Sequence, residues 1–215
     1  MFRANAKKAL EVPDLYRMAK AYVPRMFFEY VDAGSYTETT YKQNEKDFSA
    51  IALRQRVMRD VSERTLETDL FGHKYSLPVA LGPIGMVGMV RANGEILAAK
   101  AAKEYNVPLC LSNMSICSME DVYEAGGEPF FYQLYMLKDK KYMEDQIVRA
   151  KKVNCKGLVL TVDLPVLGQR HRDVRNHLKA PPPINLDTIR QFSSRSRWCL
   201  DMLSAKRQVI QQLAR

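Results

Sequence analysis

Four apolar runs recur through the middle of the chain at a nearly constant spacing. The runs are PVALGPIG (78–85), VPLCLSN (107–113), FFYQLYM (130–136) and GLVLTVDLP (157–165), and their first residues lie 23 to 29 positions apart. Helical patterns follow the first three runs, over 94–105, 118–126 and 140–153. Strand and helix that alternate at this period with short connections predict parallel βαβ units and therefore an α/β sheet.

The fourth run begins as a buried strand and then changes character. Its Leu and Val residues over 158–162 are typical of a strand covered on both faces, so we expect this strand to be wholly buried. Thr161 and Asp163 nevertheless interrupt the run, and Arg170 and Arg172 follow it. Polar groups at the end of a buried strand indicate a functional role.

The same kind of polar ending occurs on three successive strands. The residues concerned are Ser112 and Asn113, Gln133 and Tyr135, and Thr161 and Asp163. In open α/β sheets and in (β/α)8 barrels alike, ligands bind at the carboxyl ends of the strands. The sequence therefore predicts that three strands direct polar side chains towards one mouth.

The number of strands leaves two architectures open. A (β/α)8 barrel needs eight strands and about 250 residues, whereas these 215 residues supply four strands and end 50 residues after the last one. The chain is then either an open four-stranded sheet or half of a barrel. Upstream, residues 14–32 predict two helices, with Pro24 opening the second. The stretch TDLFGHKYSLP predicts a short hairpin.

Composition narrows the class of protein. The chain is 47% hydrophobic, enough for one large domain with a core. It contains neither an apolar run of eighteen residues nor the apolar core of a secretory signal, so we expect a cytoplasmic protein. The four cysteines, Cys110, Cys117, Cys155 and Cys199, form no CxxC pair. We interpret them as reduced thiols and expect no metal site.

Basic charge is concentrated in the last fifth of the chain. From Arg170 to Arg215 there are ten Lys or Arg and three Asp, which is +7 of the total net charge of +9. A solvated tail, an anionic membrane surface and a nucleic acid all fit this pattern, and charge alone favours none of them.

Seven segments resemble, in order, the FMN-dependent 2-hydroxy-acid dehydrogenase and oxidase family, whose members include membrane-associated L-lactate dehydrogenase, mandelate dehydrogenase and glycolate oxidase. They are FFEYVDAGSYTETT, FSAIALRQRVMRDVS, SLPVALGPIGMVGMVRANGE, LCLSNMSICSMEDV, FFYQLYMLKD, LVLTVDLPVLGQRHRDVRN and RSRWCLDML. The first, with IALRQRV, favours the L-lactate dehydrogenase branch. The family fold is a (β/α)8 barrel with FMN at its mouth. The resemblance therefore implies an N-terminal half barrel of four parallel βα units, preceded by N-terminal helices.

The resemblance also implies which residues meet the cofactor. Pro83, Ile84 and Gly85 are similar to the turn after the first strand, whose backbone meets the flavin, and small residues there allow a flat ring to approach closely. Ser112, Gln133 and Thr161 resemble the family's polar contacts to FMN.

Substrate contacts are implied in the same way. Tyr30 and Tyr135 match substrate-facing tyrosines, and Arg170 matches an arginine that binds the substrate. A 2-hydroxy acid has a carboxylate that arginine and tyrosine can hold. Asp163 resembles the catalytic carboxylate that orients and supports a histidine. A buried aspartate without such a partner would be costly.

The family's catalytic histidine, the arginine beside it, the lysine near flavin N1 and the phosphate-binding loops belong to the second half of the barrel, beyond these 215 residues. His73, His171 and His177 do not match the catalytic position. We expect the family pattern to end at Leu203, with SAKRQVIQQLAR as unrelated sequence of the kind that a frameshift or premature stop produces.

Residues 177–203 resemble a membrane-contacting insertion of the dehydrogenase branch. Trp198 lies among Arg195 and Arg197, and aromatic and basic residues together suit a headgroup interface. We therefore divide the chain into helices and a hairpin (1–76), a half barrel (77–176) and a basic, insertion-like tail (177–215). An anionic membrane surface on the inner face of the cell membrane is a candidate partner.

The expected function is FMN-dependent oxidation of an L-2-hydroxy acid, L-lactate first, to a 2-oxo acid. We expect this chain to be impaired or inactive by itself unless a homo-oligomer or a complementary half completes the site. Two alternatives stay open: a non-catalytic basic fragment that binds membranes or polyanions, and an open α/β binding module without flavin. No nucleic-acid partner is expected.

Overall fold

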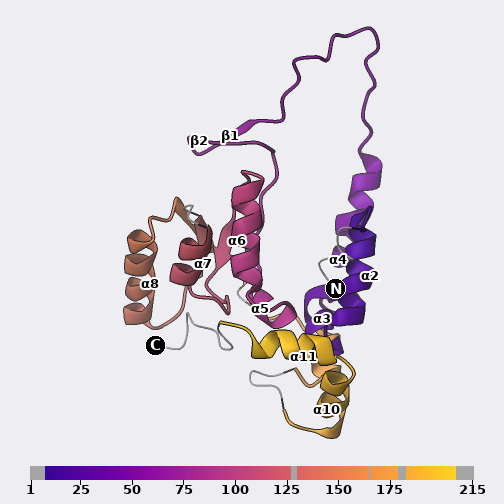
Figure 1. Cartoon of the computed structure of the whole chain (residues 1–215), viewed down its shortest axis with the longest axis vertical. Coiled ribbons are helices and arrows are strands. Elements are labelled where there is room, and N and C mark those ends of the chain that lie inside the picture. Colours follow the sequence, from indigo (N-terminus) through magenta and orange to yellow (C-terminus); the bar gives the residue numbers. More distant parts are fainter. Residues whose placement is uncertain (1–7, 127–129, 165, 179–182, 207–215) are drawn as a thin grey trace. The chain divides into compact units, whose positions relative to one another are not determined.

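The computed structural model describes residues 8–126, 130–164, 166–178 and 183–206 (Figure 1). The chain forms two compact units, each built from two stretches of sequence. The first unit combines Met1–Gln55 with Val166–Ser204, and the second combines Arg56–Pro165 with Ala205–Arg215. The division at 76 and 176 that the sequence suggested stays a prediction.

A parallel sheet forms the centre of the second unit. Its strands are β3 (Cys110–Ser112), β4 (Phe131–Tyr135) and β5 (Gly157–Thr161), in that order. Its helices are α5 (Val87–Val90), α6 (Gly94–Glu104), α7 (Met119–Gly126) and α8 (Lys140–Lys152). The register places Ser112 beside Gln133, and Tyr135 beside Thr161. The predicted order of parallel βα units is confirmed.

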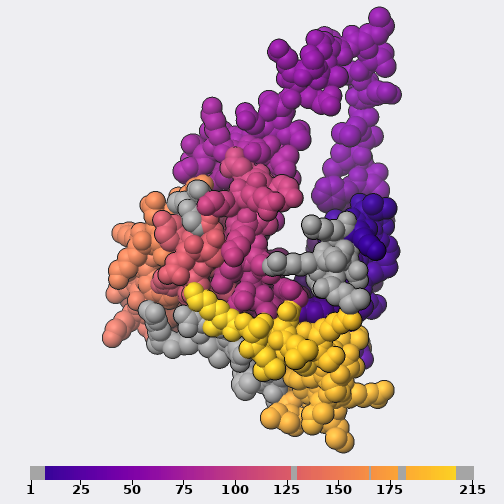
Figure 2. Space-filling model, in the orientation of Figure 1, coloured from indigo at the N-terminus to yellow at the C-terminus, as the bar shows by residue number. Residues whose placement is uncertain are grey.

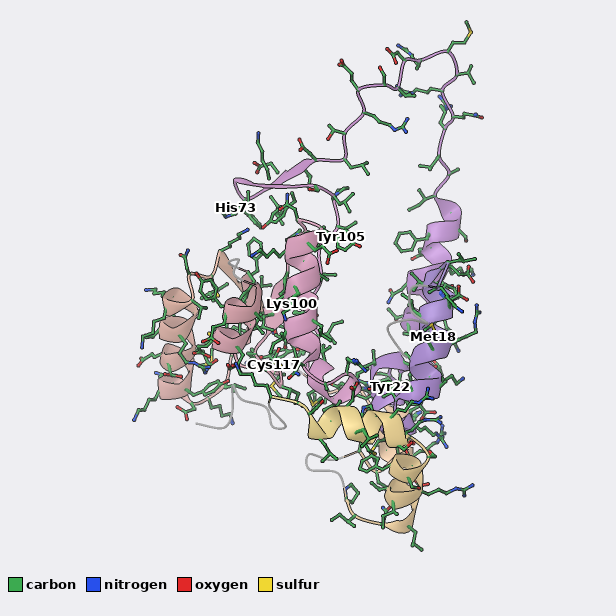
Figure 3. The ribbon with its side chains drawn as sticks, in the orientation of Figure 1. Met18, Tyr22, His73, Lys100, Tyr105 and Cys117 are labelled. Carbon is green, nitrogen blue, oxygen red and sulfur yellow. The ribbon has the colours of Figure 1, made fainter. Side chains whose placement is uncertain are left out.

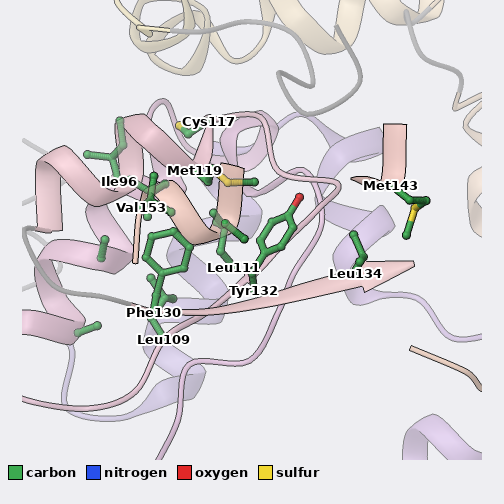
Figure 4. Close-up of a cluster of buried hydrophobic side chains, with 14 residues drawn as sticks. Ile96, Leu109, Leu111, Cys117, Met119, Phe130, Tyr132, Leu134, Met143 and Val153 are labelled. Atoms are coloured by element: carbon green, nitrogen blue, oxygen red, sulfur yellow. The ribbon is translucent and has the colours of Figure 1, made fainter. Parts of the chain in front are cut away.

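The core lies on one face of this sheet, beneath three helices (Figure 4). Because side chains alternate along a strand, Leu111, Tyr132 and Leu134 share the face that packs on α6, α7 and α8. The helices contribute Ile96, Ala99, Ala102, Met119, Val122, Met143 and Ala150. Each large apolar side chain buried here contributes roughly 1.5–3 kcal/mol. Since the helices occupy this face, the opposite face carries Ser112 and Gln133, as the inside of a barrel would.

The predicted first strand, 78–85, is largely wrong. Only Leu81 pairs with the sheet, in a single parallel bridge to Leu109. Its N–H donates to the carbonyl of Pro108, and its carbonyl accepts from Cys110, both at 2.9 Å. The next residue that would donate in this ladder is Pro83, which has no N–H, so the pairing stops there.

The strand that we expected to be buried on both faces is an exposed edge. Leu158 is 47% exposed, Val159 42% and Leu160 51%. Within the described residues β5 pairs only with β4. In a closed barrel, a neighbouring strand and a following helix would cover these side chains. The apolar composition of β5 is therefore typical of a strand inside a complete barrel.

The predicted hairpin is confirmed. Strands β1 (Thr68–Leu70) and β2 (His73–Tyr75) pair antiparallel. The two residues between them, Phe71 and Gly72, both have positive φ, as a two-residue turn of this hand requires.

The first unit is helical. Its elements are α2 (Val12–Tyr22), α3 (Arg25–Asp32), α4 (Thr39–Lys46), the 3-10 helix η1 (Asp47–Ala50), α9 (His171–Arg175), α10 (Leu186–Ser193) and α11 (Ser196–Leu203). Pro24 precedes α3 as its N-cap, which confirms two helices over 14–32.

Trp198 is buried inside this unit, and only 7% of it is exposed. Its ring centroid lies 5.3 Å from that of Phe27 and 5.4 Å from that of Phe192. The interpretation of Trp198 as an aromatic at a headgroup interface is therefore wrong, because aromatic packing removes the ring from the surface. Residues 179–182 and 207–215 of the predicted basic tail lie outside the described residues.

Candidate flavin and substrate site

A row of hydrogen bonds crosses the three parallel strands, from the last residue of β3 through the middle of β4 to the last residue of β5. Ser112 Oγ lies 3.0 Å from Gln133 Oε1, and Gln133 Nε2 donates to Thr161 Oγ1 at 2.7 Å. Ser112 Oγ also accepts from the backbone N–H of Met114 at 3.1 Å. Ser112 and Gln133 are buried. Their hydrogen bonds offset the cost of burying polar groups, and the structure joins these three predicted residues.

The turn after the first bridge lies in the same unit. Pro83 and Ile84 are exposed and Gly85 is half-buried. The N–H of Met86 donates to the carbonyl of Met114 at 2.9 Å, which ties this turn to the loop after β3. A Cβ built on Gly82 would meet no atom within 4 Å, so open space lies beside this backbone.

These residues fit a flavin ring in their chemistry. Each amide nitrogen of a glutamine carries two hydrogens and each hydroxyl carries one, so Gln133 and Thr161 retain donors beyond the bond that joins them. A flavin presents carbonyl oxygens and ring nitrogens at its polar edge. The exposed backbone at 82–84 supplies a surface that a flat ring can approach.

The predicted substrate residues Tyr30 and Arg170 meet in the first unit. The guanidinium of Arg170 lies over the Tyr30 ring, 4.7 Å from its centroid, and donates to the Tyr30 carbonyl. Arg170 Nε also lies 3.0 Å from Asp173 Oδ2. Burial raises the pKa of Asp173 although Arg170 opposes that shift. The arginine therefore already shares its charge with a partly desolvated carboxylate.

Three further contacts hold α9 and the residue after it against α3 and the segment that follows α3. Arg172 forms ion pairs with Asp32 and Glu38, each at 3.1 Å, and Asn176 Nδ2 donates to Glu29 Oε2 at 2.6 Å. These contacts fix the short helix that follows Arg170. They thereby restrict the backbone position of Arg170, which immediately precedes α9.

The other two predicted residues belong to the second unit. Tyr135 ends β4 and is half-buried, while Asp163 lies beyond β5 and is exposed. Asp163 is exposed because the edge strand before it is itself open to water. Its role beside a histidine stays a prediction.

Sequence reasoning missed two acids that are largely withdrawn from solvent. Glu95 accepts two backbone N–H groups, and Asp173 pairs with Arg170. The available signals were a carboxylate between Gly94 and an apolar helical run, and an acid three residues after Arg170. All four cysteines are free. No group of His, Cys, Asp or Glu in the described parts of the chain is arranged to hold a metal ion.

Comparison with known proteins identifies the family. The family model for FMN-dependent dehydrogenase matches residues 19–215. The L-lactate dehydrogenase of Vibrio parahaemolyticus is 41% identical over 189 residues, and that of Serratia proteamaculans is 45% identical over 168 residues. These alignments cover 88% and 78% of this chain but 50% and 44% of the relatives. The chain thus spans about half the length of these curated relatives. Because the family match continues to residue 215, the expectation that the pattern ends at Leu203 is wrong.

Solved structures agree with the sequence matches and define the fold. A crystal structure of the monotopic membrane protein (S)-mandelate dehydrogenase superposes with a TM-score of 0.87 at 27% identity, over 94% of this chain and 54% of that one. A mandelate oxidase variant with a C4a-OH-FMN adduct gives 0.73 at 33% identity, over 77% and 50%. The fold is part of an FMN enzyme's (β/α)8 barrel, as expected, and no closed barrel forms from the described strands. The chain belongs to the FMN-dependent dehydrogenase family.

Proposed function

We propose that this chain supplies one side of the site of an enzyme that oxidises an L-2-hydroxy acid, L-lactate first, to a 2-oxo acid with FMN. The observation that carries the proposal is the row Ser112–Gln133–Thr161 across the three strands, linked through Met114 to the turn that follows the exposed backbone of 82–84. When bound, FMN would accept the hydride from the substrate's α-carbon. Relatives of about twice this length are L-lactate dehydrogenases, which favours lactate.

In this proposal each residue has a limited task. Gln133 and Thr161 donate to the polar edge of the flavin, and the backbone of 83–85 lies against its ring. Arg170 holds the substrate carboxylate with the donors that Asp173 leaves unused, since a guanidinium has five N–H groups. The ring of Tyr30, 4.7 Å from the guanidinium carbon, supports the arginine by a cation–π contact. The family positions of Tyr135 and Asp163, in the second unit, suggest substrate-binding and catalytic roles for them.

The test of flavin binding compares two ligands. In such barrels the phosphate site is built from the loops after strands seven and eight, so these residues should contact the ring but not the phosphate. We expect FMN and riboflavin to bind the purified chain weakly, with Kd values within about threefold. Gln133→Leu should weaken both, and the exposed control Gln169→Leu neither. Equal binding by Gln133→Leu and the unchanged chain would refute the proposed site.

A peripheral membrane role is the second candidate. Arg197, Leu200 and Leu203 are exposed and three positions apart on α11, so they share one face of that helix. Surface atoms of α10 and α11 are visible in orange and yellow in Figure 2. A mandelate dehydrogenase with a matching fold is a monotopic membrane protein. No described helix has the length and apolarity to cross a bilayer. A basic and apolar helix face suits binding within the interface.

Vesicle co-sedimentation tests this candidate. We expect the chain to bind anionic vesicles and to release them as salt shortens the Debye length towards about 8 Å. Replacing Leu200 and Leu203 together by Glu should reduce binding. Leu10→Glu is the control, because Leu10 is 96% exposed in the same unit. An equal loss in the control, or no loss in the double variant, would overturn the role of α11.

A further inference from the structure

A buried carboxylate that no predicted role uses connects the two loops nearest the candidate flavin ring. Glu95 is the second residue of α6, and only 3% of it is exposed. Its Oε1 accepts from the backbone N–H of Gly88 at 3.1 Å and from that of Ile116 at 2.9 Å. Gly88 follows the turn of 83–85, and Ile116 follows β3. One oxygen atom therefore joins the loop after the first bridge to the loop after β3.

Gly88 and Ile116 are also in close contact with each other. Loss of the Glu95 link would therefore change a tightly packed contact. A Cβ on Gly88 would lie 2.5 Å from the Cβ of Ile116, so only glycine fits there. A Cβ on Gly94 would lie 2.7 Å from Val87 Cγ1, which brings the start of α6 equally close to α5. The loop after the first bridge is thus held between α6 and the loop after β3.

Glu95 lies in the first turn of α6, close to the thiol of Cys117. Asp and Glu in the first turn of a helix interact favourably with the helix dipole, and hydrogen bonds to a charged group are stronger than those between neutral groups. Burial first, and then the Glu95 carboxylate, raise the pKa of the Cys117 thiol to about 12. Cys117, labelled in Figure 3, therefore stays protonated beside the carboxylate at neutral pH.

The hydrogen bonds continue from this carboxylate to the candidate site. Ile116 lies two residues after Met114, whose N–H donates to Ser112 Oγ and whose carbonyl accepts from Met86. Ser112 in turn adjoins Gln133. The same two loops that Glu95 joins therefore carry both the exposed turn and the start of the polar row.

We infer that Glu95 is a positioning residue, which sets the distance between the turn of 83–85 and the polar row headed by Ser112. An effect of Glu95 on flavin binding rests on the proposed flavin site. The link itself, in which the Glu95 carboxylate holds Gly88 and Ile116 together, does not depend on flavin binding. The residue contacts neither the cofactor nor the substrate in this assignment.

Amide hydrogen exchange in the purified chain measures how strongly the Glu95 carboxylate protects the amides of Gly88 and Ile116. We expect Glu95→Ala to speed exchange at Gly88 and Ile116 by about tenfold to a hundredfold, the usual effect of losing a hydrogen bond to a charged acceptor. Sheet amides such as Leu134 should keep their rates. Glu95→Gln retains an acceptor oxygen and should restore much of the protection. Glu104→Gln is the matched control, because Glu104 is exposed on the same helix.

The outcomes separate this inference from the proposed function. Unchanged exchange at Gly88 and Ile116 in Glu95→Ala, or equal acceleration at Leu134, would overturn the positioning role. Riboflavin titration is the second readout, with weaker binding expected in Glu95→Ala than in Glu104→Gln. If the unchanged chain binds no flavin, the proposed flavin site fails, while the local loss of protection still supports Glu95 as the link between the loops. If flavin binds equally to all variants, the link does not position the site and the inference fails.

Discussion

Gln133 Nε2 donates to Thr161 Oγ1 at 2.7 Å, a side-chain hydrogen bond that adds to the backbone pairing of the parallel strands β4 and β5. Thr161→Val keeps the shape of the side chain but removes the acceptor, which leaves an amide donor of a buried glutamine unpaired. We expect the free energy of unfolding to fall by about 1–2 kcal/mol. The loss should stay below the maximum for an unpaired buried group, because Thr161 is half-buried and water can reach the site. Urea denaturation measures it. Thr161→Ser keeps the hydroxyl and should lose less, so equal losses in both variants would contradict a role for this hydrogen bond.

Substitution by alanine should have opposite effects on stability at Gly88 and at Gly82. A Cβ at Gly88 would lie 2.5 Å from that of Ile116, whereas a Cβ at Gly82 would meet no atom within 4 Å. We expect Gly88→Ala to cost roughly 1–3 kcal/mol through overpacking. Gly82→Ala should be neutral or slightly stabilising, because it restricts the unfolded chain. Thermal unfolding of both variants checks this, and a tolerated Gly88→Ala would contradict the contact between the two loops.

Asp173 should be dispensable for stability at neutral pH although it pairs with Arg170. Burial raises its pKa above the unfolded value of 3.8 despite the arginine, so the stability it contributes is present below pH 3.8 and is lost as the pH rises through the folded pKa. Asp173→Asn should therefore be at least as stable as the unchanged chain at pH 7, and this advantage should shrink as the pH falls towards 3.8. Urea denaturation at several pH values measures it.

Asp14 provides the contrasting case in the same unit. A hydrogen bond from the Leu10 backbone, then one from Arg17, lower the pKa of Asp14. Its stabilising effect is present above pH 3.8 and is lost as the pH falls through the folded pKa. Asp14→Asn should therefore be less stable than the unchanged chain at pH 7. If both variants shift stability in the same direction, the balance of burial and charge described for Asp173 is wrong.

The edge strand β5 should make the purified chain self-associate. Leu158 and Leu160 are each about half exposed, beside a row of backbone groups that no described strand covers. Exposed apolar edges template pairing with other chains. Replacing both leucines by Lys should lower the weight-average mass in sedimentation velocity. The same double change at Leu53 and Leu66, which are 96% and 63% exposed, is the control. A monomeric unchanged chain at the same concentration would contradict this prediction.

The sequence was a sound guide wherever periodicity decided the structure. The recurrence of apolar runs and helical patterns predicted β3 to β5, α6 to α8 and the polar strand ends, because Ser112, Gln133 and Thr161 would be unfavourable in a buried parallel strand unless they line a site. Apolar pattern alone could not reveal that Pro83 ends the ladder after one bridge. It also could not reveal the exposure of β5, because its composition fits a closed barrel.

The remaining errors arise from contacts between residues far apart in sequence. Trp198 looked like a membrane anchor because its neighbours are basic, but it packs on Phe27 from another part of the chain. The sequence analysis assigned no role to Glu95 and Asp173, since single carboxylates usually lie at the surface. The role of Glu95 depends on Gly88 and Ile116, which no local pattern links to it, whereas the pairing of Asp173 with Arg170 spans only three residues and could have been found from that spacing.

Flavin bleaching under anaerobic conditions is the sharpest test of the proposal that these residues form one side of an FMN-dependent 2-hydroxy-acid site. The chain would be mixed with the separately produced part of the Vibrio parahaemolyticus L-lactate dehydrogenase that lies beyond the aligned region, together with FMN and L-lactate. We expect the visible flavin absorbance to fall with the pair and to stay constant with either part alone, and Gln133→Leu to reduce the fall. Bleaching by the chain alone within seconds, or a pair that retains no FMN, would contradict the proposal.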